Sequence, residues 1–247
     1  MRGSTMDKIV ASQFITKEFQ VSEAIKTLRT NLMFSGSNIR AVALTSFGTS
    51  EGKSTISFQL AASLAQAGKR VLLVDADLRR SVLASRMCVQ GRVRGLSHFL
   101  SGQANADELI IETDVPGFYI MFAGTCVPNA SELLGSESFG KLIPALKNVF
   151  DYVIVDAAPV GHVVDCVVMA SKLDGVLMVI DANHNSHKLE RRIKQQLEMA
   201  GAKILGVILN RVDMQRKNGY YGGAYGYGYG YGYGYGETEN KNMSEGK

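Results

Sequence analysis

The sequence predicts an α/β domain whose mostly parallel β-sheet is covered by helices on both faces. Short apolar runs alternate along the chain with segments of helical periodicity, which is the pattern of repeated strand-helix-strand units. The runs are apolar at every position and not only at alternate ones, so both faces of each strand should be buried. In such a sheet, ligands bind outside the carboxyl ends of the strands. We therefore expect the functional residues to follow the strands.

Length and composition are consistent with one such domain and exclude several other classes. The 247 residues suffice for a sizeable buried core. The net charge of +4 is spread thinly and forms no basic stripe, so no nucleic-acid partner is expected. The three cysteines lie far apart and form no C-x-x-C pair, which fits a reducing, cytoplasmic environment. No apolar stretch reaches the roughly 18 residues of a membrane helix, and the start of the chain lacks a signal peptide's apolar segment.

The chain begins with a segment that precedes the first strand. Residues 1–15 form an extension, of which residues 1–5 have the character of a cloning remnant. Apolar side chains then recur at helical spacing and predict an amphipathic helix over residues 16–33. These side chains are Val21, Ile25, Leu28 and Leu32. Because this helix comes before the first strand, we expect it to be appended to the sheet domain.

The predicted helix also carries three charged residues beside its apolar stripe. Glu23, Lys26 and Arg29 are spaced three residues apart, so their side chains share one part of the helix surface. Such a surface can form a polar contact with another subunit or can remain solvated. The spacing alone favours neither.

Six strands are predicted in the domain, which extends from residue 16 to residue 213. They are expected at residues 41–46, 71–77, 119–123, 152–157, 175–181 and 204–210. A helix over residues 53–67 connects the first two strands, and further helices fall between the others.

The strongest functional signal is the segment that joins the first strand to its helix. It reads Gly48-Thr49-Ser50-Glu51-Gly52-Lys53-Ser54-Thr55, a phosphate-binding loop whose first glycine comes one position later than usual. Its backbone amides and the helix N-terminus converge where the phosphates of ATP would lie. Lys53 would reach the terminal phosphates and Ser54 a magnesium ion. The alternative, a chance glycine turn, is much less favoured because Gly-Lys-Ser-Thr lies between a buried strand and a helix.

Carboxylates follow two of the other predicted strands. Asp75 and Asp77 are separated by one residue, so in an extended segment both point to the same side and can share a metal and a proton. Alternatively, one of the two aspartates caps the N-terminus of the following helix and has no part in metal binding. Asp156 ends a later buried strand, as a magnesium-binding aspartate does in phosphate-loop proteins. A strand-end turn through Pro159 is its alternative.

After Asp213 the composition changes abruptly to a low-complexity tail over residues 214–247. Residues 219–236 are almost wholly glycine and tyrosine. Glycine keeps such a backbone mobile, so a phenol could enter a neighbouring active site. Taken alone, the repeat is more typical of a self-associating disordered tail, but the upstream site favours phosphate acceptors. The tyrosines are Tyr220, Tyr221, Tyr225, Tyr227, Tyr229, Tyr231, Tyr233 and Tyr235.

Together these residues resemble the bacterial tyrosine kinases of capsule and exopolysaccharide systems, in their stand-alone cytoplasmic form. That family is related to the division-site and partition ATPases, and the resemblance extends over residues 17–235. It is carried by the phosphate loop at 46–54, by a D-x-D-x-R motif that ends at Arg79, and by residues 153–159. The D-x-D-x-R motif separates the family from ordinary phosphate-loop enzymes. Partition ATPases carry a lysine where this chain has Gly48.

The resemblance implies a P-loop NTPase fold and a role for each charged residue of the site. Lys53 would contact the transferred phosphoryl group of ATP. Ser54, Asp77 and Asp156 would bind Mg²⁺, directly or through its water. Asp75 would accept the proton of the attacking tyrosine. The backbone amides of the loop would hold the phosphates.

Further contacts are implied by the resemblance outside the phosphate loop. Family members join into rings through an E-x-x-R-x-x-R helix, and this chain has Glu23, Lys26 and Arg29 at those positions. Partition relatives use an asparagine for adenine, which corresponds here to Asn210. Tail tyrosines would enter the active site of an adjacent subunit.

The same resemblance implies a cellular setting. A separate membrane-anchored activator would recruit the chain to the inner face of the membrane, and together they would control polysaccharide synthesis or export. Other proteins of that pathway would be further substrates. Two alternatives stay open. A partition-type switch ATPase is disfavoured by Gly48 and by the tyrosine tail, and a non-catalytic ATP-binding scaffold is disfavoured by the complete set of charged residues.

Overall fold

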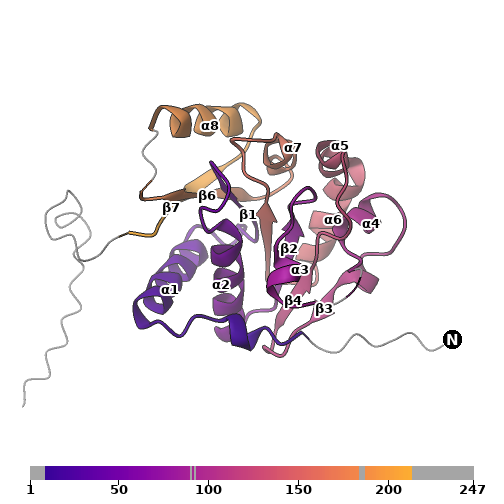
Figure 1. Ribbon diagram of the computed structural model, residues 1–247, viewed down its shortest axis with the longest axis horizontal. Coiled ribbons are helices and arrows are strands. Elements are labelled where there is room, and N and C mark those ends of the chain that lie inside the picture. The colour runs from indigo at the N-terminus through magenta and orange to yellow at the C-terminus, as the bar shows by residue number, and fades with distance from the viewer. Residues whose placement is uncertain (1–8, 90, 92, 184–186, 213–247) are drawn as a thin grey trace, which may run out of the picture. The chain divides into compact units, whose positions relative to one another are not determined.

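The sheet has seven strands in the order β3-β4-β2-β5-β1-β6-β7 (Figure 1). The computed structural model describes residues 9–89, 91, 93–183 and 187–212, to which these strands belong. Neighbouring strands run parallel, except that β3 is antiparallel to β4. The strands are β1 (Ala41–Ser46), β2 (Val71–Ala76), β3 (Ile111–Glu112), β4 (Phe118–Met121), β5 (Tyr152–Ala157), β6 (Gly175–Asp181) and β7 (Ile204–Asn210).

Helices cover both faces of the sheet (Figure 1). On one face α2 packs directly on the strands, with α1 on its outer side and the short α3 nearby. On the other face lie α4 to α8. The helices are η1 (Ser12–Phe14), α1 (Phe19–Phe34), α2 (Lys53–Gln66), α3 (Leu83–Arg86), α4 (Leu96–Leu100), η2 (Asp107–Leu109), α5 (Ala130–Gly135), α6 (Glu137–Lys147), α7 (Asp165–Ala170) and α8 (His187–Met199).

The alternation of side chains along β1 shows why its sequence is apolar throughout. Val42 and Leu44 pack into the cluster on the α2 side, whereas Ala41 and Ala43 pack with the helices of the opposite face. All four side chains are completely buried. Successive residues of a strand point to opposite faces, so a strand covered on both sides needs apolar residues at every position. The predicted sheet, mostly parallel and covered on both faces, is confirmed.

The appended helix is confirmed as α1, although it begins at Phe19 and not at Thr16. The preceding segment is extended because the Thr16 N–H donates to the Gln59 side chain of α2 at 3.1 Å. Within α1, Leu32 is buried, and Ile25 and Leu28 pack against the same core cluster as α2. The helix is therefore a second layer outside α2.

One strand was not predicted, and two others, β2 and β4, differ from the prediction at their ends; β2 ends at Ala76 and not at Asp77. β3 has two residues, too few to show a periodicity. β4 ends at Met121, before the predicted end at Ala123. The carbonyls of Phe122 and Ala123 accept the N–H groups of Leu96 and Ser97, at 2.7 and 2.9 Å, so this backbone holds the start of α4. The predicted extension up to residue 8 and the tail from residue 213 lie outside the described residues.

The carboxyl ends of β2, β5 and β1 meet because these strands are neighbours in the sheet. Asp75 of β2 pairs in register with Asp156 of β5. On the other side of β5, β1 continues into the phosphate loop. The fold thus brings together three segments that are far apart in the sequence.

Candidate active site

The phosphate loop turns from β1 into α2 between Ser46 and Lys53. Gly52 has a φ of +92°, and a Cβ at this position would lie 2.2 Å from Nδ2 of Asn210. That amide donates a hydrogen bond to the Glu51 carbonyl at 2.8 Å. Glycine is therefore required here both by the left-handed backbone and by the close approach of β7.

The Glu51 side chain closes the loop on itself. Its buried carboxylate accepts the N–H of Phe47 at 3.1 Å and that of Gly48 at 3.0 Å. The Ser46 hydroxyl also donates to the Gly48 carbonyl at 2.8 Å. A carboxylate that accepts backbone N–H groups makes strong, directional bonds. These bonds define the loop's first turn, where Phe47 replaces the usual glycine. The sequence identified Glu51 only as a member of the loop.

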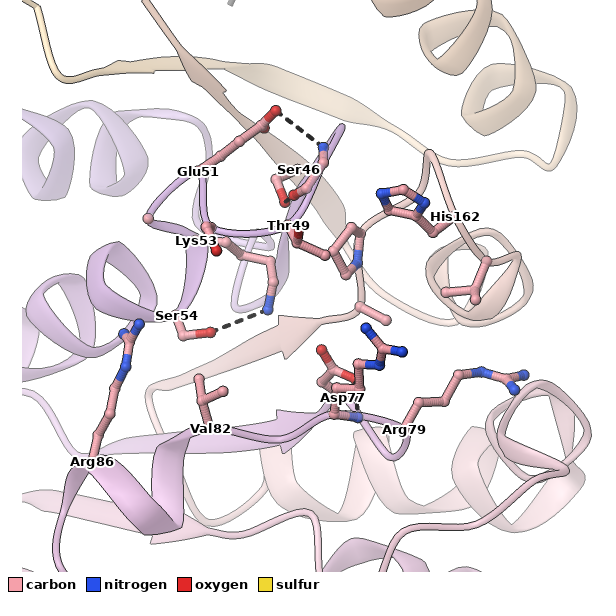
Figure 2. Close-up of a pocket in the computed structure, with 17 residues that line it drawn as sticks. Ser46, Thr49, Glu51, Lys53, Ser54, Asp77, Arg79, Val82, Arg86 and His162 are labelled. Atoms are coloured by element: carbon pink, nitrogen blue, oxygen red, sulfur yellow. Dashed lines mark hydrogen bonds between the residues drawn. The ribbon is translucent and has the colours of Figure 1, made fainter.

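Lys53 lies between a carboxylate and a hydroxyl. Its Nζ atom is 2.6 Å from Oδ1 of Asp156. It is also 3.3 Å from Oγ of Ser54 (Figure 2). The Lys53 and Asp156 side chains are only 7% and 3% exposed. Ser57, one turn along α2, donates to the same Asp156 oxygen at 3.2 Å. The structure therefore brings together three of the four residues for which phosphate and magnesium contacts were predicted, and the fourth, Asp77, is described below.

Asp75 is held inside the sheet next to Asp156. Its side chain accepts hydrogen bonds from the Ser81 hydroxyl and from the Asp77 N–H. Burial, and after it the negative charge of Asp156, raise the pKa of Asp75 from 3.8 to about 7. The hydrogen bond from Ser81 and the charge of Lys53 act in the opposite direction. A carboxyl group with this pKa can take up and release a proton near neutral pH.

Asp77 lies beyond the end of β2 and turns toward solvent. Its Oδ1 accepts the Arg80 N–H at 2.9 Å. Because β2 ends at Ala76, the strand alternation does not extend to Asp77, and its environment differs from that of Asp75. Asp77 lines the cavity described below, whereas Asp75 lies behind that lining.

A cavity of about 700 Å³ adjoins the phosphate loop. Its wall comes from three segments, namely the loop itself, the turn after β2 with α3, and the loop after β5. Figure 2 shows Asp77 and Val82 across the cavity from Lys53 and Thr49, with His162 at one side. Residues 48–54 all line this cavity. The volume falls within the range of small-molecule sites in proteins, roughly 300–1,000 Å³.

Arg79, the last residue of the D-x-D-x-R motif, forms an ion pair that the sequence did not predict. Its Nε and Nη2 atoms donate to the two oxygens of Asp165, at 2.7 and 3.0 Å. Asp165 is fully buried at the start of α7. The hydrogen bonds to Asp165 raise the pKa of Arg79 further above its ordinary value. Arg79 also donates to the Pro128 carbonyl at 3.2 Å, so it joins three segments around the cavity.

Comparison with known proteins identifies the family. The nucleotide-binding domain of the CobQ, CobB, MinD and ParA proteins matches residues 42–221, which places the chain in that domain family. The chain is also 42% identical to tyrosine-protein kinase CpsD of Streptococcus agalactiae over 194 residues, covering 78% of this chain and 85% of that protein. The chain belongs to the bacterial tyrosine-protein kinases. Two solved structures agree with this assignment.

The first of these structures is the kinase domain of the Escherichia coli tyrosine kinase ETK. It has a TM-score of 0.72 and 31% identity to this kinase, and the match covers 81% of this chain and 80% of that chain. The chimerical protein CapA2B2 has a TM-score of 0.74 and 32% identity, over 79% of this chain and 86% of that chain. The fold and the sequence therefore assign the same family.

Two predicted nucleotide contacts lie outside the cavity lining of the kinase. Thr55 is exposed, and its hydroxyl accepts a hydrogen bond from Arg86 at 2.9 Å. Asn210 lies at the end of β7, where its amide contacts the loop backbone. The next residue, Arg211, pairs with Asp181 at 2.6 Å and donates to the Ser50 carbonyl at 2.7 Å. This second anchor of the loop was not predicted.

The residues predicted for the subunit contact lie on α1. Glu23 and Lys26 form an exposed ion pair with each other at 2.7 Å. Arg29 instead contacts α2 of the same chain, donating to the carbonyl and hydroxyl of Ser63 at 3.0 and 3.2 Å. All the predicted acceptor tyrosines, Tyr220 to Tyr235, lie outside the described residues. Over the part of the chain that the structure describes, none of the helices has the length and apolar character needed to span a membrane.

Proposed function

We propose that this kinase transfers the γ-phosphate of ATP to tyrosines of its own tail, between neighbouring subunits. The observation that carries the proposal is Asp75, a buried carboxyl group with a pKa of about 7 beside the Lys53–Asp156 pair. A phosphate loop alone indicates only a nucleotide-binding protein. A proton acceptor next to that loop supports transfer of the phosphoryl group to a hydroxyl group, because the hydroxyl must lose its proton.

The donor set fits ATP with Mg²⁺. Ser54, Asp77 and Asp156 offer the oxygen ligands that Mg²⁺ prefers. When bound, the ion would offset negative charge on the phosphates during transfer. Lys53 and the backbone amides of the loop would hold and polarise the transferred phosphoryl group.

Proton removal from the acceptor is assigned to Asp75. A tyrosine hydroxyl has a pKa of about 10, so its attack at neutral pH needs a base within hydrogen-bond reach, directly or through one water. Because Asp75 does not line the cavity, it would act through such a water. An ordinary aspartate is a weak base at that pH. Burial makes Asp75 a stronger base, and its hydrogen bond to Ser81 orients the carboxylate.

The setting is proposed from the family resemblance. Subunits would join into a ring through α1, where Glu23 and Lys26 are exposed to a neighbouring subunit and Arg29 fixes the helix on α2. A membrane-anchored activator on a separate chain would recruit the kinase from the cytoplasm to the inner face of the membrane. Their joint role would be to regulate the synthesis or export of a capsular polysaccharide or exopolysaccharide.

Mass-spectrometric mapping of phosphotyrosine tests the activity. The protein is incubated with Mg-ATP, with and without the cytoplasmic segment of a candidate activator. We expect phosphate on tyrosines between Tyr220 and Tyr235. We expect none in the Lys53→Met variant, because that variant lacks the ammonium group that would contact the transferred phosphoryl group. ATP hydrolysis without any phosphotyrosine would contradict the proposal and favour a switch ATPase. ATP binding without turnover would favour a scaffold.

A further inference from the structure

The wall of the cavity that faces the phosphate loop is rich in arginine. The segment from Asp77 to α3 contributes Arg79, Arg80 and Arg86 to the lining. Figure 2 shows Arg86 rising from α3 toward Ser54, with Arg79 near Asp77. None of these arginines belongs to the phosphate loop.

Two of these cations are not neutralised. Arg79 is paired with Asp165, and the lining residue Lys53 is paired with Asp156. Within the residues that the structure describes, Arg80 and Arg86 form no ion pair, and both are exposed. In the described part of the chain, the Arg86 guanidinium has the Thr55 hydroxyl as its one hydrogen-bond partner, at 2.9 Å. The guanidinium fork matches phosphate oxygens well and binds them in pairs of hydrogen bonds.

The acidic side chains of the lining keep their charges but form no ion pair with these two arginines among the described residues. Asp77 accepts the backbone N–H of Arg80, and the Glu51 carboxylate accepts two loop amides, so their printed hydrogen bonds go to the backbone. The guanidinium groups of Arg80 and Arg86 are therefore exposed, without an ion-pair partner, in the lining of the cavity where the phosphates of ATP are proposed to lie. They can bind an anion in addition to the nucleotide.

The tail repeat supplies such an anion once it is modified. From Tyr225 to Gly236 tyrosine alternates with glycine, so the tyrosines are two residues apart. In an extended peptide, residues two apart point to the same side and are separated by about 7 Å. Glycine between them adds no side chain. If the tail binds in an extended form, the tyrosine two residues from the acceptor would point to the same side of the cavity.

We propose that Arg80 and Arg86 bind a phosphotyrosine that lies two residues from the acceptor tyrosine. The ligand is a phosphate monoester carrying a charge of about −1.5 to −2. Without the arginines, this charge would be repelled by the phosphates of ATP. With them, the first phosphorylation of the repeat accelerates the next. The inference rests on the proposed function, since it concerns the acceptor of that reaction.

Peptide kinetics test this inference. The enzyme is the full chain with phenylalanine at the eight tail tyrosines from Tyr220 to Tyr235, so that its own tail does not compete. One peptide of the tail repeat keeps a single acceptor tyrosine, and a second carries phosphotyrosine two residues after that acceptor. We expect kcat/KM to be about tenfold higher for the phosphopeptide, as for a new charge-assisted contact.

Variants assign the effect to the arginines. The ratio of kcat/KM for the phosphopeptide to kcat/KM for the unmodified peptide should fall toward one in the Arg80→Ala variant. It should fall further in the double variant Arg80→Ala with Arg86→Ala. The ratio cancels any change that affects both peptides equally. Arg94→Ala is the matched control, because Arg94 is paired with Glu108 at 3.5 Å and does not line the cavity. It should keep the full ratio.

The outcomes separate this inference from the proposed function. Equal rates for the two peptides would overturn the inference and leave the kinase activity standing, whereas phosphorylation of neither peptide would overturn the activity itself. An unchanged ratio in the arginine variants, with a raised KM for ATP, would assign these residues to the nucleotide and also overturn the inference. A peptide with glutamate in place of phosphotyrosine should have the same kcat/KM as the unmodified peptide. If it were accelerated as much as the phosphopeptide, the claim that the site binds a phosphate monoester would be contradicted.

Discussion

Asp75 links the fold to the proposed reaction. The sheet holds its carboxyl group at 1% exposure, in register with a second aspartate. Burial disfavours the charged form, so the folded protein binds a proton that the unfolded chain releases at lower pH. The same shift that suits Asp75 as a base must therefore appear in the pH dependence of stability.

The sign of that dependence follows from the direction of the shift. The pKa of Asp75 rises from 3.8 to about 7 on folding, so its contribution to stability is present below pH 4 and is lost as pH rises to 7. Asp75→Asn cannot ionise. We expect the free energy of unfolding of this variant, relative to the unmodified protein, to increase with pH across this window by up to about 1.4 kcal/mol per pH unit. Urea denaturation of both proteins at several pH values measures this difference. If their free energies of unfolding changed with pH in parallel, Asp75 would not be protonated in the folded state.

At the scale of elements, Arg79 connects segments that are not neighbours in the sequence. It lies after β2, pairs with the first residue of α7, and bonds the backbone before α5. Of these segments, the turn after β2 lines the cavity at the phosphate loop, and α7 follows the loop after β5, which lines it too. The ion pair is therefore expected to set the position of the cavity wall as well as to stabilise the fold.

Removing this ion pair leaves a buried charge without its partner. Arg79→Ala should lower the free energy of unfolding by about 3 kcal/mol, because Asp165 stays buried and cannot be solvated. Arg94→Ala removes an exposed ion pair of the same residue type and should cost less than about 1 kcal/mol. Chemical denaturation compares the two variants. Equal losses of free energy of unfolding in the two variants would contradict a larger contribution from the buried ion pair.

The same comparison shows which parts of the structure were predictable from sequence. β1, β5 and β6 were predicted with their observed bounds, because burial on both faces makes their sequences almost continuously apolar. β7 was also predicted with its observed bounds, although its side chains are partly exposed. The phosphate loop was predicted because its residues are contiguous. The pair of Arg79 and Asp165 joins residues 86 apart in the sequence, and only the packed fold brings them together. The hydrogen bonds from the Glu51 carboxylate depend likewise on the folded loop.

On the scale of the whole molecule, the chain combines a catalytic unit that ends at Val212 with a tyrosine-rich tail that follows it. The last described strand, β7, contacts the phosphate loop through Asn210 and Arg211, just before the tail begins. In the proposed function, the tail of one copy is the substrate of an adjacent copy. Each added phosphate brings about −1.5 to −2 charges, so repeated modification would weaken the proposed ring of subunits.

The most direct test of transfer between subunits is a mixture of two complementary variants. One chain carries Lys53→Met and an intact tail, and the other has a complete active site but phenylalanine at the eight tail tyrosines. Each is incubated with Mg-ATP alone and together, under conditions in which the unmodified protein phosphorylates itself. We expect phosphotyrosine between Tyr220 and Tyr235 of the Lys53→Met chain in the mixture only. A mixture that contains no phosphotyrosine on that tail would contradict the account.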